Sequence, residues 1–175
     1  MDNKDVRLAF TDNLGKEWDY SVKNLPFKVV KRNDYYVVSV LGADTFFEII
    51  SSIFFPTLST KIRWNKIKDK IFKKIPLGSI IKLTAFSMGA AILEYGTREL
   101  INRGYILVDA CLMNPFKSVK KYNGIVRNTK DFCSLWPFFR KGHDKTITIK
   151  SPYNFLRFKK NHFYIRDYIM NGGII

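Results

Sequence analysis

The chain has 175 residues, 46% of them apolar and 15% aromatic, a composition that excludes a disordered segment and can fill one buried core. Its two cysteines, Cys111 and Cys133, form no C-x-x-C motif, and no His or Cys cluster has metal-ligand spacing, so we expect neither a disulfide framework nor a zinc site. The formal net charge of +15 predicts an anionic partner, but charge alone does not separate nucleic acid, an anionic membrane surface and an acidic protein.

The positive charge is uneven, because residues 1–50 carry 7 basic and 8 acidic groups and residues 51–175 carry 23 and 7. Much of it lies between Lys61 and Lys74, where seven basic residues alternate with apolar ones. This pattern is typical of the solvated face of a packing helix, and contact with anionic lipid or polymer is the alternative. The N-terminus lacks the apolar run of a secretory signal, so we expect an intracellular or virion-associated protein.

The sequence patterns predict both strands and helices along the chain. Strands are expected at 35–44, 79–86, 105–116 and 145–150, with a short strand within 124–132, and helices at 45–55, 62–75, 87–104 and 161–170. The apolar stretch at 45–58 contains Glu48 and ends near Pro56, which is too short to span a bilayer. Nearly continuous apolar strands separated by helices predict an α/β fold, with a mostly parallel central sheet flanked by helices, in a single domain over 1–175.

Ser87 lies between the strand at 79–86 and the helix that follows, with small residues at Ala85, Gly89 and Ala90. A tight strand-to-helix turn brings neighbouring backbone close at such positions and raises the serine above the sheet edge. The start of a helix would also stabilise an oxyanion. Ser87 is therefore a candidate nucleophile, and the alternative is a small packing residue where a strand meets a helix.

In this segment, Ala85-Phe86-Ser87-Met88-Gly89 resembles the G-x-S-x-G turn of the α/β-hydrolases, and within them the class 3 lipases. Upstream, "VVSVLGADTFFEII" resembles the family's strand leading to R-G-[ST], with Leu41 in place of the arginine. The resemblance implies a minimal α/β-hydrolase-like fold in which the backbone N–H groups of Ala43 and Met88 form the oxyanion hole.

Downstream, "VRNTKDFCSLWP" resembles the family's N-x-x-D segment, and "NHFYIRDYI" resembles its H-x-x-Y ending. The resemblance implies that Asp131 is the acid and His162 the base of a Ser-His-Asp triad. His143 is a competing base. Asp144 is expected to be a solvated loop carboxylate, and Asp109, a rival acid only if its strand ends early, is expected to be a core or edge polar group.

These features predict a lipase or esterase-like serine hydrolase that acts on acyl esters or lipids and needs no metal or organic cofactor. The alternative is a catalytically inactive hydrolase-fold protein with a structural or assembly role, for example in a virion or on a membrane, through its basic surface. An anionic membrane surface or an acidic protein would be the partner, whereas charge alone supports nucleic acid.

Overall fold

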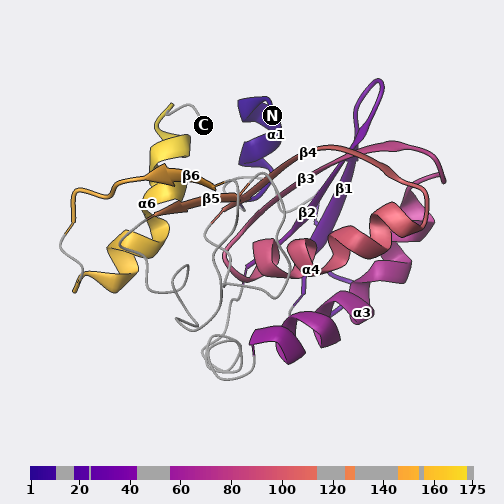
Figure 1. Cartoon of the computed structure of the whole chain (residues 1–175), viewed down its shortest axis with the longest axis horizontal. Helices are drawn as coiled ribbons and strands as arrows, with labels where there is room; N and C mark the ends of the chain where they lie inside the picture. Colours follow the sequence, from indigo (N-terminus) through magenta and orange to yellow (C-terminus); the bar gives the residue numbers. More distant parts are fainter. Residues whose placement is uncertain are drawn as a thin grey trace.

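The computed structural model describes residues 1–10, 18–23, 25–42, 56–113, 125–128, 146–153 and 156–172. These ranges contain both helices and strands (Figure 1). The elements are α1 (Asn3–Arg7), β1 (Phe27–Lys31), β2 (Tyr36–Val40), α3 (Pro56–Lys74), β3 (Ile80–Phe86), α4 (Met88–Asn102), β4 (Ile106–Met113), β5 (Ile125–Asn128), β6 (Thr146–Ile149) and α6 (Phe158–Met170).

The described strands form one sheet in the order β1-β2-β3-β4-β5-β6. Only the pairing of β1 with β2 is antiparallel, and each later neighbouring pair is parallel. The connection from β2 to β3 contains α3, and α4 connects β3 to β4, as parallel strands require. The predicted α/β architecture with a mostly parallel sheet and flanking helices is confirmed.

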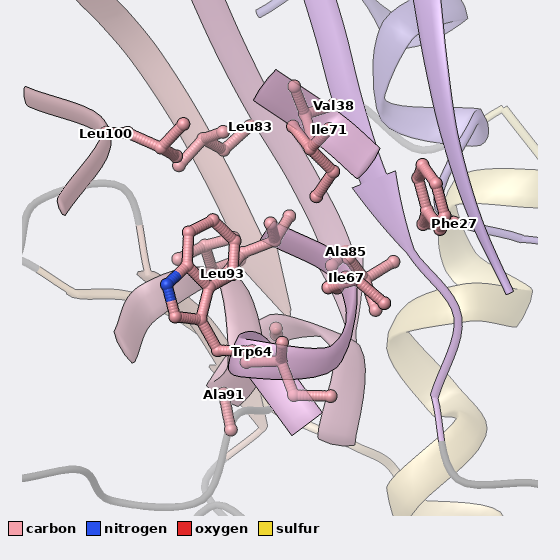
Figure 2. Close-up of a cluster of buried hydrophobic side chains, with 14 of the residues drawn as sticks. Phe27, Val38, Trp64, Ile67, Ile71, Leu83, Ala85, Ala91, Leu93 and Leu100 are labelled. Atoms are coloured by element: carbon pink, nitrogen blue, oxygen red, sulfur yellow. The ribbon is translucent and has the colours of Figure 1, made fainter. Parts of the chain in front are cut away.

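One face of the sheet is covered by α3 and α4, which lie together on the same side of the strands (Figure 1). The apolar residues of α3 recur at helical spacing, so Trp64, Ile67 and Ile71 all enter the core while the lysines between them point outward. Figure 2 shows Trp64 beside Leu93 of α4, with Leu83 and Ala85 of β3 in the same cluster. Burial of this face holds the helical layer on the sheet.

A carboxylate also joins the two helices of this layer. The indole nitrogen of Trp64 donates to Glu99 of α4 at 2.7 Å, and Lys68 binds the other carboxylate oxygen at 3.0 Å. Burial acts to raise the pKa of Glu99, but the contacts from Trp64 and Lys68 outweigh it, so the pKa lies below its usual value. Glu99 is therefore held ionised between α3 and α4.

The opposite face of the sheet is covered by α1 and α6. Ile165 and Ile169 of α6 pack with Val6 of α1, and Phe86 of β3 belongs to the same cluster. The side chain of Thr84 in β3 donates to the carbonyl of Val6 at 3.3 Å, which fixes α1 on the sheet. The C-terminal helix is thereby brought to the end of β3, although β4, β5 and β6 lie between them in sequence.

Three features of the fold differ from the sequence-based expectations. The sequence patterns predict neither α1 nor β1, and α3 begins at Pro56 rather than at residue 62. The helix expected at 45–55 lies outside the described residues. No helix within the described ranges has both the length and the hydropathy that crossing a bilayer requires.

Candidate active site

Ser87 occupies the turn between β3 and α4 in a backbone conformation that residues other than glycine rarely adopt. Its φ is 55° and its ψ is −124°, and it is the one non-glycine residue with positive φ in the described part of the chain. Its N–H donates to the carbonyl of Met113 at the end of β4, at 2.8 Å, and its carbonyl accepts from the N–H of Ala91, at 3.2 Å. The chain on both sides therefore fixes a strained turn.

Two glycines around this turn lie against neighbouring chain, and at Gly89 the backbone is too close to admit a Cβ. A Cβ at Gly89 would lie 2.7 Å from the carbonyl carbon of Val40 and 2.9 Å from the carbonyl oxygen of Leu41. A Cβ at Gly42 would lie 3.2 Å from the carbonyl oxygen of Phe86 and 3.5 Å from the Cβ of Ser87. The segment that follows β2 therefore passes directly beside Ser87, where the family resemblance predicts an oxyanion-binding segment.

His162 of α6 meets Ser87 from the other side of the sheet edge. Its Nε2 lies 2.9 Å from the Oγ of Ser87, across 75 positions of sequence. When Nδ1 carries the proton, Nε2 accepts a hydrogen bond from the serine hydroxyl, which is the geometry in which imidazole removes that proton. The structure thus brings together the nucleophile and the base predicted from sequence.

Two phenylalanine rings hold the imidazole of His162. The ring centroid of Phe86 lies 4.9 Å from that of His162 with an interplanar angle of 45°, and Phe163 lies 5.3 Å away at 75°. Phe86 is buried and is the last residue of β3, directly before Ser87. No motif in the sequence singles out these rings, although alternation along β3 directs Phe86 to the face opposite Ala85.

The remaining predicted site residues divide into those within the described ranges and those beyond them. Asp131, Ala43, His143 and Asp144 lie outside the described residues. Met88 is the first residue of α4, directly after Ser87, so its N–H lies at the helix N-terminus where the prediction requires a donor.

Asp109 lies in the middle of β4, opposite Lys82, and β4 continues past it to Met113, which pairs with Phe86. Its carboxylate forms an ion pair with the amino group of Met1 at 2.7 Å. Asp109 is therefore an ionic group within an interior strand that does not end early, which agrees with its interpretation as a core or edge polar group rather than a rival acid.

Cys111 does not supply a reactive thiol near the site. Burial raises the pKa of this thiol to about 12, so it stays protonated at neutral pH. Within the ranges that the structure describes, no group of three or more His, Cys, Asp or Glu side chains could hold a metal ion.

A serine on a strained strand-to-helix turn, with a histidine on its hydroxyl and a mostly parallel sheet beneath, defines a lipase-like α/β fold. Solved lipases have this fold. Lip2 lipase from Yarrowia lipolytica aligns with a TM-score of 0.55 and 12% identity, over 78% of this chain and 65% of that one. The Rhizomucor miehei lipase in its propeptide complex aligns with a TM-score of 0.56 and 12% identity, over 77% and 54%.

The similarity lies in structure rather than in sequence. No family model matches the chain, and no curated protein matches it. The chain spans between about half and two thirds of the length of the two lipases that it resembles.

Proposed function

We propose that the protein is a serine hydrolase that cleaves acyl esters through an acyl-enzyme intermediate. The observation that supports this proposal is the 2.9 Å separation of the Ser87 Oγ and the His162 Nε2, at a strained turn. Lipase-like neighbours at 12% identity agree with it at the level of fold.

In this mechanism His162 takes the hydroxyl proton as Ser87 attacks the ester carbonyl. The same imidazole then gives the proton to the departing alkoxide, and water repeats the sequence to release the acid. Phe86 and Phe163 restrict the ring of His162 to the orientation that points Nε2 at Ser87. Asp131, assigned from its sequence segment, would hold Nδ1 protonated and stabilise the imidazolium.

The tetrahedral intermediate needs donors for its oxyanion. The N–H of Met88 at the start of α4 and that of Ala43 would supply them, and the positive end of α4 would add to the stabilisation. A backbone donor does not depend on the side chain, so the absence of the arginine at Leu41 does not remove it.

The substrate class in this proposal is an acyl ester, including lipid esters. The second candidate is an inactive hydrolase fold with a structural or assembly role. Leu41 in place of the family's arginine and the formal net charge of +15 favour this alternative.

A fluorophosphonate probe, which labels activated serines, tests the proposal. We expect labelling of the wild-type chain and its loss in Ser87→Ala, with a fall of at least about 100-fold in His162→Ala. Ser79→Ala is the matched control, since Ser79 precedes the other end of β3 and should label as the wild type does. Absence of labelling in a folded wild-type protein would reject the hydrolase and leave the inactive scaffold.

Asp131→Asn tests the third member of the triad separately. We expect a loss comparable to that of His162→Ala, with Asp144→Asn as the control carboxylate. Equal loss in both variants, or a loss in Asp144→Asn alone, would contradict the assignment of Asp131.

A further inference from the structure

The first half of α3 presents two aliphatic side chains to solvent. Leu58 is 55% exposed and Ile62 is 46% exposed, one helical turn apart. They lie on the side of the helix opposite Trp64 and Ile67, which are fully buried. The outward face of α3 is therefore apolar in its first half although the helix has already buried its core-facing stripe.

Positive charge surrounds this apolar pair. The helix carries seven basic residues and a single acidic one, Asp69. Lys68 and Lys74 are bound to carboxylates of neighbouring segments. The exposed cations on the outward face of α3 are Lys61, Lys66 and Lys73.

This surface lies at the same edge of the molecule as Ser87. Because β2 and β3 are parallel, α3 runs back along the sheet and its first turns lie at the carboxyl ends of these strands. Ser87 directly follows the carboxyl end of β3. The first turns of α3, which carry Leu58 and Ile62, therefore lie toward the same edge of the sheet as Ser87.

We propose that the first half of α3 docks the protein onto an anionic lipid bilayer. Leu58 and Ile62 enter the interface between headgroups and acyl chains, while Lys61 and Lys66 contact anionic headgroups on either side. Exposed aliphatic side chains between lysines match a bilayer better than a nucleic acid, because nucleic-acid phosphates would bind the lysines but not the aliphatic side chains. The docking needs no catalysis, but its role in presenting ester substrate to Ser87 rests on the proposed function.

Vesicle flotation tests the docking. We expect the wild-type protein to float with phosphatidylcholine vesicles that contain about 30% phosphatidylserine, in about 0.1 M salt, and to bind pure phosphatidylcholine vesicles at least about tenfold more weakly. The double variants Leu58→Ser/Ile62→Ser and Lys61→Glu/Lys66→Glu should each lose about tenfold or more in binding.

Matched double variants on other surfaces serve as controls. Leu77→Ser/Ile101→Ser changes two aliphatic side chains at the far end of the helical layer that are at least as exposed as Leu58 and Ile62. Lys4→Glu/Lys31→Glu gives the same charge change on exposed lysines elsewhere. Both should bind vesicles as the wild type does, and circular dichroism should show all four variants folded. Equal losses in the control and α3 variants, or unchanged binding of the α3 variants, would overturn the proposal.

Two further measurements distinguish bilayer docking from RNA binding and from catalysis. Salt-dependent binding to RNA without binding to anionic vesicles would replace the bilayer with a nucleic acid as the partner. The α3 variants should keep fluorophosphonate labelling in solution, because no α3 side chain is assigned to the triad. Vesicle binding without labelling of the wild type would reject the hydrolase and retain the docking surface.

Discussion

The ring of Phe86 and the imidazole of His162 are in contact, with centroids 4.9 Å apart. Phe86 is the residue before the candidate nucleophile, and His162 is the candidate base 76 positions later in the chain. Strand alternation turns Phe86 away from Ala85 toward α6 while the turn lifts Ser87 above the edge. The same short segment of β3 therefore supplies both the nucleophile and the surface on which its base rests.

Replacing Phe86 by leucine should impair the site through His162. Leucine keeps an apolar residue in β3 but removes the ring that restricts the imidazole, so we expect fluorophosphonate labelling to slow about tenfold. The nuclear magnetic resonance signals of the His162 ring should also shift, since they lose the ring-current effect of Phe86. Phe10→Leu is the control, because the ring centroids of Phe10 and Phe86 are 5.7 Å apart and both residues lie in the same cluster. If both variants label at the same rate, Phe86 has only a packing role.

Even the substitution Gly89→Ala should destabilise the protein. In an ordinary helix this change stabilises by about 1 kcal/mol, but here the added Cβ would collide with the backbone of Val40 and Leu41. We expect Gly89→Ala to lower the free energy of unfolding by at least about 2 kcal/mol, measured by urea denaturation.

Two other substitutions in α4 set the scale for that measurement. Ala90→Gly reports the helix propensity and loss of a buried methyl, at about 1 to 2 kcal/mol. Gly96→Ala should also destabilise, because its Cβ would lie 2.5 Å from the Trp64 ring, but a side chain can shift more readily than backbone. A Gly89→Ala protein as stable as the wild type would contradict the close approach of β2 to this turn.

The turn at Ser87 could be predicted because its rules are local. A β-branched strand, small residues at fixed offsets and an amphipathic helix are all visible within the 24 residues from Ile80 to Arg103. The helix end at Gly104 was equally visible, since its φ of 93° is one that glycine adopts without strain. The contact between Ser87 and His162 followed instead from the family resemblance, because no local pattern specifies it.

Other features depended on tertiary contacts that local patterns do not reveal. The start of α3 at Pro56 was not predicted, because its first turn places Leu58 in solvent and the buried apolar spacing begins only later. Proline at the first helical position is itself a signal for the start of a helix. Strand β1 contains Lys28, which is buried with its ammonium 4.3 Å from the centroid of the Trp18 ring. A lysine at a buried position interrupts the apolar pattern by which a strand is predicted. The contact of Phe86 with His162 exists only once α6 has docked.

Stability at acid pH should depend on Asp19. Hydrogen bonds from Ser21, and the ammonium of Lys74 at 3.1 Å, lower the pKa of this carboxyl from 3.8 to about 2. A lowered pKa in the folded state gives stability that is complete above the unfolded value and is lost as the pH falls through about 2. Ionised Asp19 therefore contributes about 1 to 2 kcal/mol at neutral pH.

The variant Asp19→Asn lacks this titration. We expect its free energy of unfolding to be lower than that of the wild type at neutral pH, and the difference to shrink as the pH falls from 3.8 toward 2. Urea denaturation at several pH values measures both quantities. Asp34→Asn removes a carboxylate at an exposed position beside β1 and serves as the matched control. A difference between wild type and Asp19→Asn that stays constant over this range would refute the assignment.

The backbone of Ser87 predicts opposite effects on stability and activity from one substitution. Its φ of 55° and ψ of −124° are readily adopted by glycine but costly for any residue with a Cβ. Ser87→Gly should therefore raise the free energy of unfolding above that of Ser87→Ala by about 1 to 2 kcal/mol, while both variants lose labelling. Denaturation of the two variants side by side isolates the strain, because neither has the hydroxyl that contacts His162. If Ser87→Gly is less stable than Ser87→Ala, the turn is not strained, and the hypothesis that a side chain is kept there for its chemistry fails.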